Sequence, residues 1–202
     1  MDEALHQHAE AIAEMLGRSL SAHSIAHGEL TITVAPADIV AVVKALRDDP
    51  RCQYWSLIDV TAIDWPSREP RFDVVYHFLS PRHNRRVRVK AEVAEGASIA
   101  SIIEVFPGAD WFEREAYDLY GVPFTGHPDM RRLLTDYGFE GHPLRKDFPL
   151  TGFVEVRYDD EQKRVFTSPC GWRRSSATSI FCRRGKGPII PCRATRRRRA
   201  RE

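Results

Sequence analysis

The sequence lacks long apolar runs. No stretch approaches the ~18 consecutive apolar residues of a membrane-spanning helix, although 43% of the 202 residues are hydrophobic. The first residues, MDEALHQHAEAIAEML, contain no basic start followed by a long apolar run, which argues against a secretory signal. We therefore expect a cytoplasmic chain with enough apolar material for a core, which can still sit on a membrane-bound partner.

Motifs that hold redox cofactors are also missing. The four cysteines form no Cys-x-x-Cys pair and no ferredoxin-type run, which argues against an iron–sulfur cluster in this chain. No glycine-rich phosphate loop follows a strand, which argues against direct binding of a dinucleotide. Cys52 stands alone, without a nucleophile–base arrangement around it, and we expect a buried, inert thiol.

Acidic residues are nearly absent from the end of the chain. Residues 166–202 carry ten Arg and one Lys against a single Glu, and they contain three of the four cysteines. Residues 1–165 instead have a net charge of −8, from 19 basic and 27 acidic residues. The composition therefore predicts a break near Val165.

Periodic patterns in residues 1–120 predict a single α+β domain. Apolar residues at helical spacing predict helices at 5–16, 36–49, 98–106 and 110–120, and alternating residues predict strands at 30–34, 55–63, 72–78 and 86–93. Short links between the last three strands favour antiparallel neighbours, because a parallel crossover needs a dozen or more residues. The predicted fold class is α+β, with a mixed, largely antiparallel sheet and helices mainly on one face.

The last of these helices has specific end signals. Asp110 is expected to cap it, with Glu113 three residues further on, and Gly121 is expected to end it. Arg114 and Asp118 have the i,i+4 spacing of an ion pair. Glu113, Glu115 and Asp118 could suggest acid–base chemistry. Glu113 and Glu115 do not face each other, so we interpret the carboxylates as capping, ion-pairing and partner-contacting groups.

Residues 121–165 are predicted to be an extended interface segment. Four prolines and four glycines between 121 and 150 interrupt nine large apolar residues. A connection of this length is uncommon unless it binds something or is disordered, and this one is too apolar for a solvated linker. Arginines alternate with the apolar residues, and both types are enriched in interface hot spots. We expect the segment to lie on another protein, because its own domain offers too little core to bury it.

His127, Asp129 and His142 in this segment raise the possibility of a metal site. Metal-binding histidines usually project from rigid elements at spacings that bring them together. Each histidine here precedes a proline in a loop. We favour Gly-His-Pro turns whose imidazoles bond to the backbone or to a partner.

The segment and the helix before it carry a dense motif. In order, it consists of Glu113-Arg114-Glu115, Asp118-Leu119-Tyr120-Gly121, Phe124, His127-Pro128-Asp129, Arg131-Arg132-Leu133-Leu134, Gly141, Pro143, Leu144-Arg145-Lys146-Asp147-Phe148-Pro149, Gly152, Glu155 and Arg157-Tyr158. This motif resembles the signature of the 30-kDa subunit family of respiratory complex I, the proton-pumping NADH:quinone oxidoreductase. In bacteria, the member of this family is the C subunit of the complex. The resemblance covers about residues 1–165.

The resemblance implies a non-catalytic subunit of the peripheral arm, on the cytoplasmic side of the bacterial inner membrane. The complex passes electrons from NADH through FMN and iron–sulfur clusters to a quinone such as ubiquinone and couples this to proton translocation. This chain is expected to hold no catalytic residue, cofactor or metal, and no nucleic acid.

The implied partners are the large quinone-site subunit, which is homologous to the hydrogenase large chain, its iron–sulfur neighbour and other peripheral-arm subunits. The motif residues expected at the partner interface are Glu113, Arg114, Glu115, Asp118, Phe124, His127, Arg131, Arg132, Leu133, Leu134, Arg145, Lys146, Asp147 and Phe148.

Two alternative functions come from other classes. The chain could be the homologous subunit of a membrane-bound hydrogenase. It could also bind nucleic acid through its basic tail, whose charge attracts phosphate, although the tail has no recognisable fold and no aromatic platform.

The resemblance stops near Val165. Family members continue with a segment rich in acidic and aromatic residues, whereas residues 166–202 have no apolar periodicity. A GC-rich message in a shifted frame tends to give Arg, Pro, Ala, Ser and Cys. We therefore expect that a one- or two-base shift replaced the native tail and that the tail is disordered. The alternative is a genuine basic tail that binds nucleic acid or anionic lipid.

Overall fold

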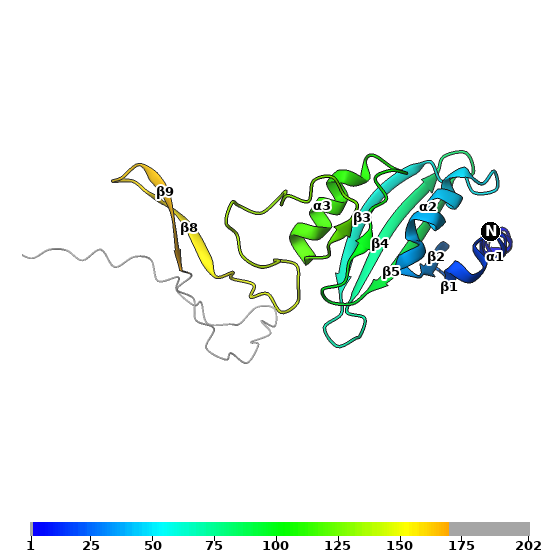
Figure 1. The fold of residues 1–202 in the computed structure, drawn as a ribbon, viewed down its shortest axis with the longest axis horizontal. Helices are drawn as coiled ribbons and strands as arrows, with labels where there is room; N and C mark the ends of the chain where they lie inside the picture. Colours follow the sequence, from blue (N-terminus) through cyan, green and yellow to red (C-terminus); the bar gives the residue numbers. More distant parts are fainter. Residues whose placement is uncertain (1, 170–202) are drawn as a thin grey trace, which may run out of the picture. The chain divides into compact units, whose positions relative to one another are not determined.

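The computed structural model describes residues 2–169 (Figure 1). The chain divides into two compact units that meet between Gly152 and Phe153, and each is described by itself. The boundaries predicted at 120 and 165 do not coincide with this division. No helix in the described part is long and apolar enough to cross a membrane. The prediction that the tail is disordered concerns mostly residues 170–202, which lie outside the described range.

The first unit is built on a five-stranded sheet in the order β1-β2-β5-β4-β3. The strands are β1 (Leu20–Ala26), β2 (Glu29–Val34), β3 (Ser56–Asp64), β4 (Phe72–Ser80) and β5 (Arg85–Val93). Only β2 and β5 pair in parallel, and the other neighbours pair antiparallel. The predicted mixed, largely antiparallel sheet is therefore confirmed. Edge strand β1 was not predicted, because its mostly exposed residues show no apolar alternation.

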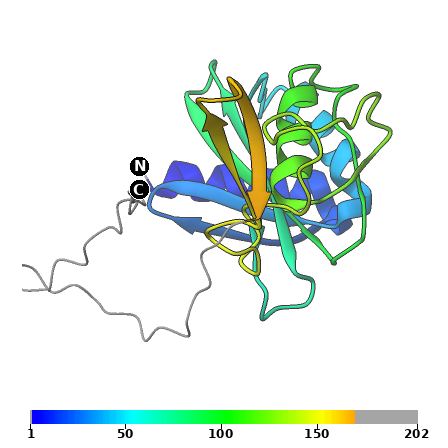
Figure 2. The same ribbon diagram turned by 90° about the vertical axis from the view of Figure 1, so that its left-hand side faces the viewer.

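Three α-helices cover one face of this sheet. They are α1 (Asp2–Leu16), α2 (Ile39–Asp48) and α3 (Ala109–Tyr120), with short 3-10 turns η1 (Gly17–Ser19) and η2 (Pro36–Asp38). Their buried residues, such as Ile12, Val43 and Ala116, join one core cluster with Tyr76 and Val89 of the sheet. Figure 2 shows α2 and α3 on the same side of the strands. This arrangement confirms the predicted α+β class.

The prediction of a helix at 98–106 is wrong. Ile99–Ala100 instead form a short strand, β6, which pairs in parallel with β7 (Phe124–Thr125). The backbone N–H groups of Ile99 and Ser101 donate to carbonyls of Pro123 and Thr125. These pairings hold residues 99–101 in an extended conformation, although Ile102 and Phe106 still reach the core.

The second unit, in its described part, is a two-stranded hairpin. Strand β8 (Val154–Asp159) pairs antiparallel with β9 (Arg164–Pro169). Residues 166–169 therefore belong to a strand rather than to the disordered tail we expected. Val154, Val156 and Tyr158 are each at least half exposed. An isolated two-stranded hairpin is marginally stable in water, so these apolar groups indicate a surface that gains stability when covered.

Candidate partner interface

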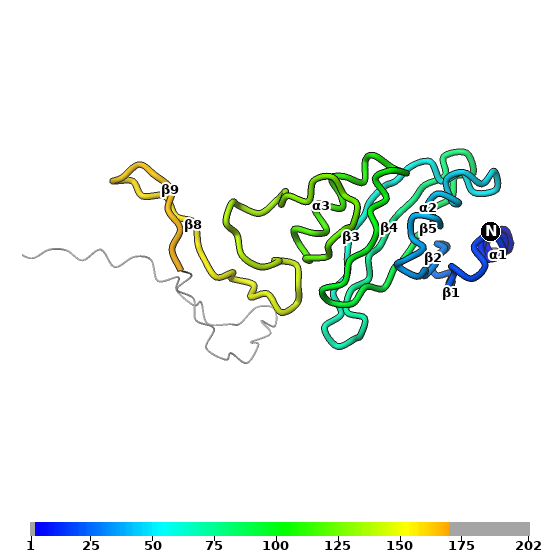
Figure 3. The backbone as a smooth tube through the Cα atoms, viewed as in Figure 1, coloured from blue at the N-terminus to red at the C-terminus, as the bar shows by residue number. Residues whose placement is uncertain are grey.

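Helix α3 is the platform from which the irregular segment 121–152 departs. Gly121 ends the helix with a left-handed φ of 77°, and its N–H donates to the Tyr117 carbonyl. A Cβ at Gly121 would lie 2.5 Å from the Nε2 atom of His142. Both the backbone conformation and the close approach therefore require glycine. Figure 3 follows the irregular path of the segment after α3.

Asp118 on α3 binds the segment as a buried hub. Its Oδ2 atom accepts hydrogen bonds from the backbone N–H groups of Leu133, Leu134 and Thr135 at 2.8–3.1 Å. Its Oδ1 atom accepts from the Thr135 hydroxyl at 2.6 Å and from Arg132 at 3.2 Å. Burial alone would raise the pKa of Asp118, but the bonds from Thr135 and its neighbours outweigh it and lower the pKa. The carboxylate therefore fixes the turn at 132–135.

Asp64 at the end of β3 is a second buried hub. The Arg71 guanidinium donates to both of its oxygens, at 2.7 and 2.9 Å, and the Lys146 backbone N–H donates at 2.8 Å. The bonds from Arg71 lower the pKa of Asp64. Arg71 also pairs with Glu95 and Asp147, each at 3.0 Å. This network fastens residues 146–147 to the sheet.

Arg145 connects the two hubs. Its guanidinium donates to the Tyr120 carbonyl at 2.6 Å and pairs with Glu95 at 2.9 Å. It also lies over the Phe72 ring, 5.1 Å from the centroid. Arg145 therefore has its polar contacts inside its own domain, as does Asp147 through Arg71.

His127 is buried beside α3. Its Nδ1 atom accepts the Asp129 N–H at 3.0 Å, which places the ring proton on Nε2. Nε2 lies 3.1 Å from Asp110 Oδ1 and 3.2 Å from the Asp110 carbonyl. The predicted capping role of Asp110 is wrong, because α3 begins without a side-chain cap and Asp110 faces His127. The imidazole bonds to the backbone, as the interpretation of Gly-His-Pro turns required.

Glu113 has no exposed surface. It accepts hydrogen bonds from the Ser101 hydroxyl at 2.6 Å and the Ile102 N–H at 2.8 Å. Burial raises its pKa. The predicted ion pair between Arg114 and Asp118 does not form within the described residues. Arg114 instead donates to the Arg131 carbonyl, and Asp118 pairs with Arg132 of the segment.

The structure therefore divides the fourteen predicted interface residues by accessibility. Glu113, Asp118 and Phe124 are buried in the fold, and the ring of His127 is covered as well. Exposed residues are Arg131, Leu134, Lys146 and Asp147. The other six, which are half-buried, are Arg114, Glu115, Arg132, Leu133, Arg145 and Phe148. Only the last two groups have surface to offer, and their contact with a partner stays a prediction.

Large apolar residues remain on the outside of the segment. We call Leu134, Tyr137, Leu144 and Leu150 the exposed set; their exposed fractions are 59%, 109%, 46% and 88%. In contrast, the network formed by the hub Asp64 with Arg71 and Glu95 was not predicted. These residues belong to no short motif, and Asp64 meets Lys146 only through folding.

The metal-site alternative finds no support in the geometry. His127 bonds to Asp110, whereas His142 bonds to the Asp118 carbonyl at the other end of α3. Within residues 2–169, no cluster of His, Cys, Asp or Glu could hold a metal ion. Cys52 is buried, and burial raises the pKa of its thiol to about 11.

Residues 32–154 match the family described as the 30 kDa subunit of respiratory-chain NADH dehydrogenase. The chain belongs to this family. It is 64% identical over 193 residues to the C subunit of NADH-quinone oxidoreductase from Rhodopseudomonas palustris, covering 94% of this chain and 95% of the relative. The protein of the same name from Mesorhizobium japonicum is 66% identical over 155 residues, 77% of each chain. The resemblance inferred from the motif is confirmed, and these names disfavour the hydrogenase alternative.

A solved structure supports the fold. A chain of the membrane-bound sulfane sulfur reductase, an archaeal respiratory membrane complex, aligns with a TM-score of 0.63 and 22% identity. The alignment covers 80% of this chain and 98% of that one. Family membership therefore rests on the sequence matches, and the structural match adds the shared architecture.

Proposed function

We propose that the chain is a non-catalytic peripheral-arm subunit of NADH:quinone oxidoreductase and that residues 121–152 dock it to the large quinone-site subunit. One observation carries the proposal. The polar groups of this segment bind the domain's own hubs, Asp118 and Asp64, whereas the exposed set faces solvent. The segment is held in place before a partner arrives.

This arrangement suits a stable interface. Exposed apolar residues gathered on one segment mark a surface that another protein covers. A segment already fixed by hydrogen bonds loses less conformational entropy on binding than a mobile one. Arg131, whose side chain is 80% exposed, adds a charged group of the type enriched in hot spots.

Electron transfer then belongs to other subunits, which carry FMN, the iron–sulfur clusters and the quinone site. The chain contributes by holding the large subunit and its iron–sulfur neighbour in place. Its proposed location, peripheral on the cytoplasmic side of the inner membrane, follows from assembly with that complex.

Affinity purification tests the proposal. The tagged full-length chain is expressed in its host and isolated from membranes in mild detergent. The other subunits of NADH:quinone oxidoreductase and NADH oxidation should co-purify with it. Recovery of the complex without the chain, or of the chain with nucleic acid alone, would contradict the proposal.

A further inference from the structure

A basic patch lies at the turn between β4 and β5. We call Arg82, Arg85 and Arg86 the basic turn. Within the described residues, none of the three lies within 4.0 Å of a carboxylate, although other arginines of the same unit do. Those that form such pairs are Arg47, Arg51, Arg68, Arg71, Arg88, Arg131, Arg132 and Arg145. The basic turn is therefore a concentration of uncompensated charge within residues 1–165, which are acidic overall.

One titratable neighbour of the basic turn is a neutral pair. His8 of α1 bonds to the Tyr54 hydroxyl at 2.9 Å. Burial, with Arg85 and His83 adding to it, lowers the His8 pKa to about 4. The nearby carboxylate of Glu29 is already paired with Arg88, so the three arginines can still take a counter-charge from outside.

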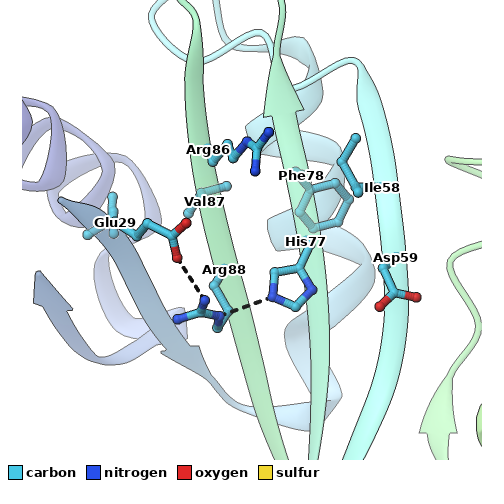
Figure 4. Close-up of a pocket in the computed structure, with 9 residues that line it drawn as sticks. Glu29, Ile58, Asp59, His77, Phe78, Arg86, Val87 and Arg88 are labelled. Carbon is cyan, nitrogen blue, oxygen red and sulfur yellow. Dashed lines mark hydrogen bonds and ion pairs between the residues drawn. The ribbon is translucent and has the colours of Figure 1, made fainter. Parts of the chain in front are cut away.

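Two cavities adjoin the basic turn, and Arg86 lines both. One, of about 270 Å³, has the exposed Ile58 as its apolar side, whereas Leu30 and Phe78 beneath it belong to the buried core. The other, of about 340 Å³, lies between Leu5 and the basic turn. Figure 4 shows Arg86 extending from β5 along the first cavity.

Arg88 forms a fixed wall of the first cavity. It donates to Glu29 at 2.8 Å and to His77 at 3.1 Å (Figure 4). Its charge is therefore compensated, while that of Arg86 is not. The cavity offers one available guanidinium beside the exposed Ile58.

This chemistry favours a peptide over other anions. A cavity of this size is below the roughly 300–1,000 Å³ of small-molecule sites and suits one apolar side chain. Glu29 and Asp59 on its rim would repel the closely spaced phosphates of nucleic acid or of a lipid surface. Carboxylates on a flexible segment can instead reach the arginines singly and avoid those two acids.

We propose that the basic turn docks an acidic segment of a neighbouring subunit, with its carboxylates on Arg82, Arg85 and Arg86 and one apolar side chain in the cavity against Ile58. The inference rests on the proposed function, because the occupant is another chain of the same complex. It assigns a second contact surface, separate from residues 121–152.

The test uses the full-length tagged chain in the assembled complex. A photo-cross-linking amino acid replaces Arg82, and the cross-linked peptide is identified by mass spectrometry. We expect a peptide rich in Asp and Glu from one neighbouring subunit. Arg86→Glu should lower the yield of that product at least about tenfold, a loss equivalent to one charge-assisted contact. The control Arg18→Glu, at another exposed arginine without an ion pair, should leave it unchanged.

Three outcomes would overturn the inference while the complex still co-purifies: no cross-link, a cross-link to lipid or nucleic acid, or a yield that Arg86→Glu leaves intact. Failure of the proposed function is distinguishable, because the wild-type chain would then not co-purify with the complex. Reversal of one acidic residue in the captured segment to Arg should restore the yield in the Arg86→Glu background.

Discussion

The Oδ2 atom of Asp118 accepts the backbone N–H of Leu134 at 2.8 Å. The carboxylate is buried, whereas the Leu134 side chain is 59% exposed. One hydrogen bond thus joins a fixed point in the fold to an apolar group that faces outward. Lys146 is fixed in the same way, because its backbone N–H donates to the buried Asp64 while its charged side chain is exposed.

Replacement of Asp118 by Ala should release the turn at 132–135. Three backbone N–H groups and Arg132 would lose their acceptor. Leaving buried donors unsatisfied costs about 1–3 kcal/mol each, partly recovered by water. We expect a loss of about 3 kcal/mol in the free energy of unfolding in urea. Asp136→Ala, at an exposed position of the same segment, is the control and should change it by less than about 0.5 kcal/mol.

Stability should fall in acid because of the same residue. The pKa of Asp118 is lowered in the folded state, so its contribution is present above the unfolded value of ~3.9 and is lost as the pH falls through the folded pKa. Unfolding measured between pH 6 and pH 2 should show this decline. Asp118→Asn should weaken the decline, and an unchanged slope would contradict the assignment.

Arg71→Lys should loosen residues 144–148. Lysine cannot reproduce the two-fold contact with Asp64 and the pairs with Glu95 and Asp147. The Lys146 N–H, which donates to Asp64, should exchange with solvent at least about tenfold faster, which corresponds to about 1.4 kcal/mol. Arg51→Lys, at an exposed ion pair, should leave this exchange rate unchanged.

Some of these features were predictable from local pattern. Alternation in β5 is regular because one face of that strand packs into the core, whereas the first five residues of β4 are buried on both faces. The end of α3 at Gly121 was predictable because only glycine adopts that conformation cheaply. The absence of a helix at 98–106 and the two hubs were not predictable from local pattern. They arise because Glu113, Asp118 and Asp64 accept hydrogen bonds from backbone N–H groups far away in the sequence.

Leu134→Asp should impair assembly without harming the fold. The side chain is mostly exposed, so the free energy of unfolding should change by less than about 0.5 kcal/mol. A carboxylate placed against an apolar partner surface would be desolvated, and co-purification of the other subunits should fall several-fold. The control is Ala41→Asp at an exposed position of α2. Equal loss of assembly in both variants would contradict a specific role for Leu134.

The intact mass of the native subunit tests the predicted shift in the reading frame. If a sequencing error produced residues 166–202, the mass should differ from the 23.1 kDa of the chain as written. A mass equal to that of the chain as written would contradict the hypothesis of a sequencing error. The alignment with the Rhodopseudomonas palustris relative spans 94% of the chain and so extends past Val165, which contradicts the expectation that the resemblance stops there.

Footprinting of the exposed set tests the central claim most directly. Leu134, Tyr137, Leu144 and Leu150 would be labelled by hydroxyl radicals in the isolated chain and in the purified complex, with Trp55 and Trp65 as exposed references outside the segment. If residues 121–152 dock the chain, labelling of the exposed set should fall strongly on assembly. Labelling of the set that is equal in both samples would contradict the proposed interface.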